Sequence, residues 1–368
     1  VGAGNVVSGD FTNIDWGNDS YYIKNEIDPT GGTNYTITGA SQLLSVPYAL
    51  HAANASSSDN DIPDGNANGN TLFWDGSEWM PSDLLRNDGN RIGIGANNLQ
   101  ATFHIGGFGA IDGILVTGTH GQGQDLNISG SGTRMLFYPK KSAFRAGRVT
   151  GNQWDNVQIG DYSLGFGVNT EASGNASSAW GRNTIASSDG STAWGRQTEA
   201  SGLESTAWGS FTIASGAQST TFGDSSTASG LESTAWGDNT EASGAQSTAF
   251  GDGATASGIE STAFGNNTTA SGQKATAWGR NTEATGTEST SWGSYTIASG
   301  DRSTAWGDDN EALGDHSTSW GEDNLSEEDY TTTWGRNVSA KSAYETVIGR
   351  YNTDYTPSSS STWNGDDR

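Results

Sequence analysis

A 14-residue repeat occupies about half of this 368-residue chain and limits the folds that it can adopt. An aromatic residue followed by glycine recurs in unbroken register, and Ile348-Gly349 closes the series. The aromatic positions are Phe166, Trp180, Trp194, Trp208, Phe222, Trp236, Phe250, Phe264, Trp278, Trp292, Trp306, Trp320 and Trp334. A second glycine follows eight residues after the aromatic, so the consensus reads S-T-A-[WF]-G-x-x-T-x-A-S-G-x-x.

This repeat is too short for a helical hairpin, which needs more than about 30 residues. It suits two short strands, S-T-A-[WF] and T-x-A-S, each closed by a glycine that is free to adopt positive φ. The frequent threonines and the alternation of apolar positions also favour strands over helices. Each repeat would be one coil of a solenoid, with equivalent residues stacked roughly 4.8 Å apart.

The side chains that face the coil interior can be predicted from the alternation along each strand. Five residues past the aromatic the identity varies, which is typical of a solvent-exposed column; its members include Glu199, Ile213, Thr227, Glu241, Thr255 and Glu283. Its neighbours Thr198 and Ala200 would then point inward. We expect the aromatic residues to fill the interior opposite them as the structural core, with Ala207, Ala235 and Ala249 facing outward. The alternative places the alanines inside the coil and the aromatics between chains. A coil this thin buries little by itself, so both arrangements predict oligomerisation.

The repeat resembles the head repeats of the YadA-like trimeric autotransporter adhesins, which read S-V-A-I-G-x-x-A-x-A-x-G-x-x. The resemblance covers Phe166 to Gly349. It implies an all-β fold, a left-handed parallel β-roll solenoid in which three chains wrap one axis as a homotrimer. The chain departs from the family by using Thr and Trp or Phe where the family prefers Val and Ile. The family's membrane-anchoring barrel is not present in the sequence, so autotransport is not implied.

Composition excludes several classes of protein. The chain has 42 acidic against 17 basic residues, a net charge of −25, which argues against binding to nucleic acid or to an anionic membrane. It has no cysteine, which excludes disulfides and thiolate metal sites. No apolar run approaches the roughly 20 residues of a membrane-spanning helix. We therefore expect an extracellular or cell-surface protein, or one carried on a phage or injection particle.

The segments around the repeat differ from it. We predict an N-terminal β-rich attachment or assembly unit at 1–60, with a short helix at 41–55 that Ser45 caps and Pro47 begins. A linker and hairpin connector follow at 61–107, with an Asp-Gly turn within 71–80. A β-rich neck at 108–160 precedes the roll at 161–350, and 351–368 form a tail. The phrases LLSVPYALHAANA, NTLFWDGSEW and GTRMLFYPKKSAFRAGR resemble secreted or phage-tail-fibre-like proteins of Bacteroidota-type bacteria.

The sequence contains no recognisable catalytic motif. The histidines His51, His104, His120 and His316 lack the spacing of metal ligands. No nucleophile elbow, Walker loop or Rossmann fingerprint occurs, so we expect no enzyme activity and no cofactor.

Two clusters of charged residues suggest ligands. A basic cluster with nearby aromatics fits an anionic glycan, or else forms ion pairs within the neck; it comprises Arg134, Lys140, Lys141, Arg145 and Arg148. Asp224, Asp238 and Asp252 share one repeat position and form a weak candidate site for a divalent cation such as Ca²⁺, with plain solvation as the alternative.

These features predict a structural, homotrimeric extracellular fibre or adhesin segment that mediates surface attachment or forms a filament. Its partners would be two further copies of the chain and a surface glycan or protein receptor. The alternative is a receptor-binding tail fibre of a phage or contractile injection particle.

Overall fold

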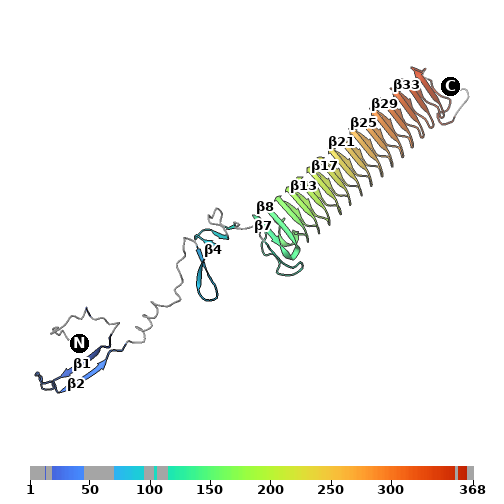
Figure 1. The fold of residues 1–368 in the computed structure, drawn as a ribbon. Coiled ribbons are helices and arrows are strands. Elements are labelled where there is room, and N and C mark those ends of the chain that lie inside the picture. Colours follow the sequence, from blue (N-terminus) through green and yellow to red (C-terminus); the bar gives the residue numbers. More distant parts are fainter. Residues whose placement is uncertain are drawn as a thin grey trace. The chain divides into compact units, whose positions relative to one another are not determined.

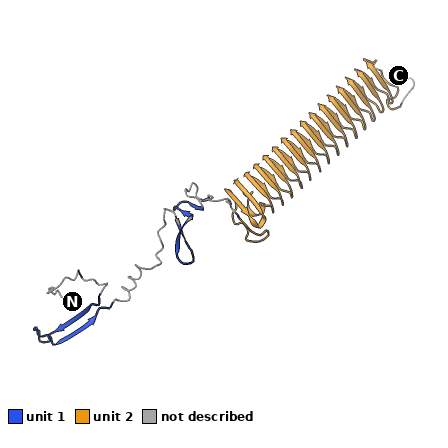
Figure 2. Cartoon of the chain, viewed as in Figure 1, with its two compact units in different colours: residues 1–115 blue, residues 116–368 orange. Residues whose placement is uncertain are grey.

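A computed structural model describes residues 13, 19–44, 70–94, 103–105, 115–352 and 355–362. The chain divides into two compact units, residues 1–115 and 116–368 (Figure 2). Strands make up nearly all of the regular structure in the described ranges (Figure 1).

The first unit contains two small sheets. Strands β1 (Tyr22–Ile27) and β2 (Ile37–Gln42) pair antiparallel. A four-stranded sheet comprises β3 (Asn70–Trp74), β4 (Trp79–Asn87), β5 (Ile92–Ile94) and β6 (Phe103–Ile105). The β3–β4 hairpin turns at Asp75-Gly76, as its sequence predicts. Within the segment 41–55 that was expected to hold a short helix, residues 41 and 42 end β2. The part from Ser45 onward lies outside the described residues.

The second unit starts with an antiparallel hairpin of β7 (Gly132–Tyr138) and β8 (Ala143–Val149). The 3₁₀ turn η2 (Pro139–Lys141) joins the two strands, and η3 (Asn156–Gln158) follows β8. Strand β8 then pairs in parallel with β9, the first strand of the repeat. Residues that were expected to form a separate neck thus continue a sheet of the roll.

The repeat forms a β-solenoid whose long and short strands alternate along the chain (Figure 1). The long strands are β9 (Leu164–Val168), β11 (Ser178–Arg182), β13 (Thr192–Arg196), β15 (Thr206–Ser210), β17 (Thr220–Asp224), β19 (Thr234–Asp238), β21 (Thr248–Asp252), β23 (Thr262–Asn266), β25 (Thr276–Arg280), β27 (Thr290–Ser294), β29 (Thr304–Asp308), β31 (Thr318–Glu322), β33 (Thr332–Arg336) and β35 (Thr346–Arg350). The short strands are β10 (Glu171–Ala172), β12 (Ile185–Ala186), β14 (Glu199–Ala200), β16 (Ile213–Ala214), β18 (Thr227–Ala228), β20 (Glu241–Ala242), β22 (Thr255–Ala256), β24 (Thr269–Ala270), β26 (Glu283–Ala284), β28 (Ile297–Ala298), β30 (Glu311–Ala312), β32 (Leu325–Ser326) and β34 (Ser339–Ala340).

Each strand pairs in parallel with the equivalent strand of the next coil. The short strands build a 13-stranded sheet, and the long strands with β7 and β8 build a 16-stranded one. The register pairs equivalent positions of successive repeats, so that Trp194 pairs with Trp208 and Ala242 with Ala256. The turns stack in the same way, since the amide of Asn239 donates to the carbonyl of Asp224 at 2.9 Å. The predicted all-β solenoid of 14-residue coils is therefore confirmed.

The interior of the repeat coils holds mainly alanine, serine and threonine, with Asn310, Asn324 and Val338 as larger exceptions. In one coil, Ser233, Ala235, Thr240 and Ala242 are buried, whereas Trp236 is 50% exposed and Ala235 is 0% exposed. Thr198 and Ala200 point inward as predicted. The prediction that the aromatics form the coil core is wrong, and Ala207, Ala235 and Ala249 lie inside instead of outside. The two sheets lie so close together that alanine opposite serine or threonine fills the space, which leaves no room for a ring.

The two glycine columns serve different purposes. Gly237 has φ of +138°, and a Cβ there would lie 1.8 Å from the carbonyl oxygen of Gly251. Gly244 does not have a positive φ, contrary to the prediction for the second glycine, but its Cβ would lie 2.0 Å from the carbonyl oxygen of Gly258. Close approach of successive coils therefore favours glycine at both positions, although Ser188 and Glu328 occupy the second column in their coils. Positive φ requires glycine at the first position.

Candidate functional site

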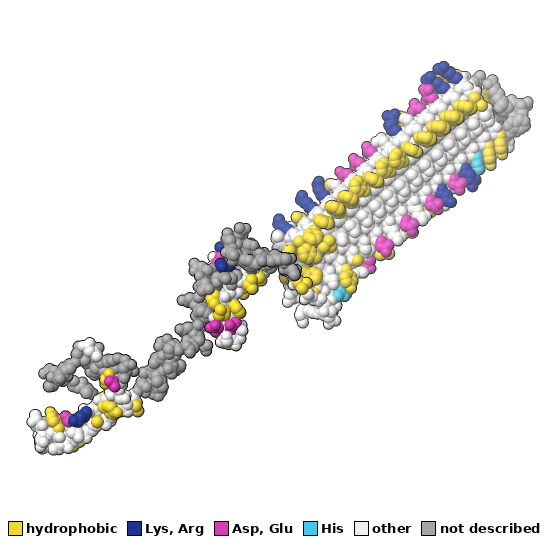
Figure 3. Space-filling view, viewed as in Figure 1, with side chains coloured by type: hydrophobic (Ala, Val, Ile, Leu, Met, Phe, Trp, Pro, Cys, Tyr) yellow, Lys and Arg dark blue, Asp and Glu magenta, His cyan; other side chains and the backbone are white. Residues whose placement is uncertain are grey.

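The outer face of the 16-stranded sheet carries a continuous column of aromatic rings. The aromatic column comprises Phe144, Phe166, Trp180, Trp194, Trp208, Phe222, Trp236, Phe250, Phe264, Trp278, Trp292, Trp306, Trp320 and Trp334. Adjacent ring centroids lie between 4.8 and 5.5 Å apart. Figure 3 shows this column as a hydrophobic stripe along the second unit. Most of its rings are exposed in the single chain.

A threonine column runs parallel to the aromatic column, two residues before it on the same outer face. Its members are Thr192, Thr206, Thr220, Thr234, Thr248, Thr262, Thr276, Thr290, Thr304, Thr318, Thr332 and Thr346. The two columns together form a face that is regular, largely uncharged and open. Contiguous apolar surface of this extent is typical of an interaction surface.

The aspartates proposed as a cation site lie on the edge beside this face. Asp224, Asp238 and Asp252 occupy successive coils in direct register. The outer two accept ordinary hydrogen bonds, Asp224 from the Ser225 hydroxyl and Asp252 from the Asn266 amide, both at 3.1 Å. In the described ranges, no three His, Cys, Asp or Glu side chains are grouped so that they could hold a metal ion. The geometry thus gives the calcium hypothesis no support.

The basic cluster does not form one surface patch, because the structure separates its members. Arg145 faces the coil interior and is fully buried, where its guanidinium donates to the carbonyls of Phe144, Ser163 and Ala172 at 2.9 Å each. Burial lowers the pKa of Arg145 to about 10. The guanidinium also donates to the Ser163 hydroxyl at 2.7 Å. Arg145 therefore closes the end of the roll and cannot reach an external glycan.

The other four bases point in different directions. Lys140 pairs with Asp125 at 2.7 Å, and this hydrogen bond raises the pKa of Lys140. Lys141 donates to the carbonyls of Asn156 and Ile159 at 2.7 and 2.5 Å. Arg134 donates to the carbonyl of Gly130, and Arg148 is exposed. Four of the five bases are engaged in contacts within the chain. The five residues therefore do not form the shared anion site that the sequence suggested.

The histidines are likewise dispersed among the described residues. His120 stacks on Tyr162 with centroids 4.6 Å apart, and its Nε2 lies 3.4 Å from Asp161. His316 stacks on Tyr330 at 4.8 Å. His51 lies outside the described residues, as does the side chain of His104.

Sequence reasoning missed a polar ladder on the turns that precede the long strands from β15 onward. Every member has φ between 55° and 65° in the left-handed region; the ladder runs Glu204, Gln218, Glu232, Gln246, Glu260, Lys274, Glu288, Arg302, His316, Tyr330 and Tyr344. Gln218 donates to Glu204 at 3.0 Å, and Arg302 to Glu288 at 3.0 Å. No two carboxylates are adjacent in the ladder. Reading the repeat position by position would have revealed this alternation.

Comparison with known proteins agrees with this geometry. Segments between residues 159 and 321 match the family model for the YadA head domain repeat (2 copies). They lie at 159–184, 186–212, 209–233, 228–254, 242–268, 256–282, 270–296, 284–310 and 298–321. No curated protein matches the chain in a sequence comparison. The structure extends the same coil beyond this match, to β35. The resemblance of the flanking segments to tail-fibre-like proteins stays a prediction.

Proposed function

We propose that this chain, whose residues 159–321 are YadA head domain repeats, is a non-enzymatic, homotrimeric segment of an extracellular adhesin fibre. The family implies trimeric assembly, and its head repeats are typical of surface-exposed adhesins. No helix in the described ranges is both long and apolar enough to cross a membrane.

The aromatic column carries this proposal. A chain that exposes a row of indole and phenyl rings over its whole length has a strong hydrophobic tendency to associate. The rings are already about half buried in the single chain, so burying the rest of each contributes about half of the 1.5–3 kcal/mol of a fully buried large side chain. Summed over the rings of three chains, this outweighs the roughly 4–15 kcal/mol that each association costs. In the proposed trimer, the aromatic and threonine columns of the three chains face one another.

The small coil interior supports the same arrangement. One coil buries alanine, serine and threonine but no large side chain, so each chain gains little hydrophobic stability alone. The apolar core that a rod of this length needs is supplied when the aromatic columns meet. The proposed trimer thus corresponds to the alternative arrangement of the sequence analysis, with alanines inside the coil and aromatic residues between chains.

The columns on the other faces would then serve recognition. Glu199, Glu241 and Ile213 project from the short strands, on the sheet opposite the aromatic column, and their identity changes from coil to coil. A rigid trimer would present such columns at fixed heights to a glycan or protein receptor. A phage or injection-particle tail fibre would use the same roll, and the head-repeat family favours the adhesin.

Native mass spectrometry of the full chain tests the assembly, with a trimer as the expected species. Replacing Trp236 and Trp278 together by aspartate should shift the protein toward monomers, because six carboxylates would enter the shared core of each trimer. The control is Glu241→Gln, which lies on the opposite sheet and should remain trimeric. A stable, folded monomer of the unmodified chain would overturn the proposal. Binding of the trimer to intact cells, and its loss on changing exposed columns, tests attachment.

A further inference from the structure

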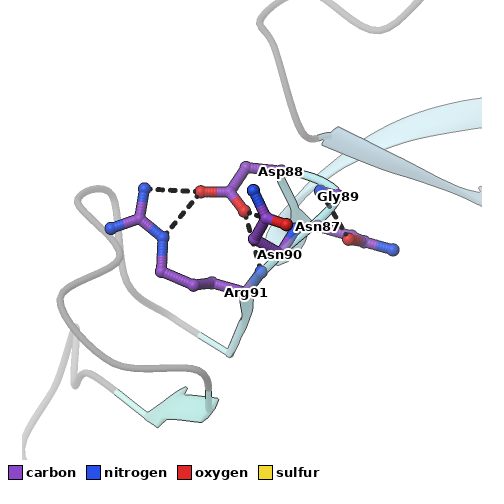
Figure 4. A network of polar contacts seen from close by, with 5 residues as sticks. All are labelled: Asn87, Asp88, Gly89, Asn90 and Arg91. Atoms are coloured by element: carbon purple, nitrogen blue, oxygen red, sulfur yellow. Dashed lines mark hydrogen bonds and ion pairs between the residues drawn. The ribbon is translucent and has the colours of Figure 1, made fainter.

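The hairpins of the first unit have turns that their own sequence specifies. Asp75 accepts hydrogen bonds from the amides of Ser77 and Glu78 at 2.7 and 2.8 Å, which closes the β3–β4 turn. Asp88 accepts from the amides of Asn90 and Arg91 at 3.1 and 2.8 Å, and Arg91 Nε donates back to it at 2.8 Å (Figure 4). Hydrogen bonds between residues close in sequence therefore fix both turns of the sheet formed by residues 70–94.

This sheet exposes large apolar side chains on both faces. Trp74 pairs across the hairpin with Trp79, with ring centroids 5.7 Å apart, and the two residues are 49% and 43% exposed. Phe73 pairs with Met80 on the opposite face, and both are also exposed. Next to them, Leu85 pairs with Ile94, again in the open.

Such a sheet is not stable by itself in water. A two-stranded hairpin is at best marginally stable, and a sheet of three or four short strands is stabilised by burying a hydrophobic face. None of the described residues covers either face of this sheet. The polar groups that would make the hairpin soluble lie elsewhere. The acids Asp75 and Glu78 sit at the turn, while the paired positions from Leu72 to Trp74 and from Trp79 to Pro81 carry no charge. Figure 3 shows hydrophobic side chains along this hairpin and acidic ones at its end.

We infer that residues 70–94 form a second assembly contact, in which the sheet of one copy packs its Trp74–Trp79 face against the same sheet of the other two copies. This inference rests on the proposed trimer. Residues 106–131 link this sheet to β7, so three rolls held together would tether three copies of the sheet at an effective concentration on the order of millimolar. Uncharged apolar faces can meet even though each chain carries a net charge of −25.

The absence of cysteine allows a direct test by cross-linking. Leu72→Cys in the full chain places one thiol on the hairpin face that carries Trp74, and Glu241→Cys places one on the short-strand sheet of the roll, away from the aromatic column. A short bis-maleimide should link Leu72→Cys chains into covalent dimers, since each chain has one thiol and the reagent joins two thiols. The Glu241→Cys chains should stay single under the same conditions.

Amide exchange of the unmodified chain provides the second measurement. In the trimer, amides of β3 and β4 should be protected at least about 100-fold relative to an unstructured peptide. Trp79→Ser should abolish this protection while the roll stays protected and trimeric. The matched control is Glu78→Gln, in the same turn, which should leave exchange unchanged.

The results separate this inference from the proposed function. A monomer by native mass refutes the trimer itself. A trimer by mass whose Leu72→Cys chains do not link, and whose β3 and β4 exchange freely, refutes only the second contact. It would leave the tryptophan pair open to another occupant, such as a sugar ring.

Discussion

The Cα of Gly237 lies so close to Gly251 of the next coil that an added Cβ would be 1.8 Å from that residue's carbonyl oxygen. No side chain can be accommodated there unless the two coils separate. Separation would break the parallel pairing of β19 with β21, which joins the two coils. The tight stacking of coils therefore depends on this pair.

Gly237→Ala should destabilise the roll by more than about 4 kcal/mol, since it combines backbone strain with an unavoidable clash. Gly349→Ala is the matched control, because Gly349 has a similar φ of +135° but nothing within 4 Å of its Cβ position. It should cost only the strain, about 1–3 kcal/mol. Gly244→Ala measures the cost of a Cβ clash alone, because Gly244 has a close carbonyl neighbour but no positive φ. Chemical denaturation of the three variants measures these differences, and equal costs for Gly237 and Gly349 would contradict the steric argument.

Ala235 and Trp236 are neighbours with opposite orientations, so enlarging one and trimming the other should have different consequences. Ala235→Leu overpacks the coil interior and should cost at least about 1–3 kcal/mol in every chain. Trp236→Ala should weaken association between chains and leave the single coil folded. Glu241→Gln should change stability by less than about 0.5 kcal/mol. Thermal melts combined with native mass distinguish these effects. A Trp236→Ala chain that unfolds without dissociating first would place the ring inside the coil after all.

Arg145 and Arg148 lie on one strand and face opposite sides, which makes a matched pair. Arg145→Glu should severely disrupt the start of the roll, because a buried carboxylate would face the carbonyls that now accept from the guanidinium. Arg148→Glu should be tolerated, since its side chain is exposed. Amide exchange of β8 to β11 measures the effect locally. Similar exchange in the two variants would mean that Arg145 does not close the roll.

The hairpin turns of the first unit should weaken in acid. Hydrogen bonds from the amides of Glu78 and Ser77 lower the pKa of Asp75 below its ordinary value of 3.8, and the Asn90 amide and the Arg91 side chain do the same for the pKa of Asp88. A carboxyl with a lowered pKa in the folded state stabilises that state above the ordinary value. The contribution is lost as pH falls through the lowered value.

We therefore expect protection of β3 and β4 to be constant above pH 5 and to decrease below about pH 4. Amide exchange corrected for its intrinsic pH dependence measures this. Asp75→Asn keeps an acceptor without the charge and should show a smaller decrease. If protection decreases equally in the unmodified chain and in Asp75→Asn, titration of Asp75 does not cause the loss of protection in acid.

The sequence predicted the solenoid because a register that never slips over 14-residue steps permits few other folds. It also predicted that Thr198 and Ala200 point inward. It did not settle the orientation of Trp236, because alternation identifies two faces without telling which one is inside. That choice depends on the distance between the two sheets of a coil, which follows from the backbone of the turns. The role of Arg145 was missed for a related reason. Its neighbours Phe144 and Arg148 suggested a surface patch, and only the pairing of β8 with β9 turns it toward the interior.

The identical pairing of every coil with the next has a consequence for how such a chain can change over generations. Insertion or deletion of a whole 14-residue unit keeps the register of all the remaining coils. Each such event lengthens or shortens the rod by one step of about 4.8 Å and leaves the kind of neighbour above and below each residue almost unaltered. The reach of the fibre can therefore be adjusted in discrete increments, independently of the surface that it presents.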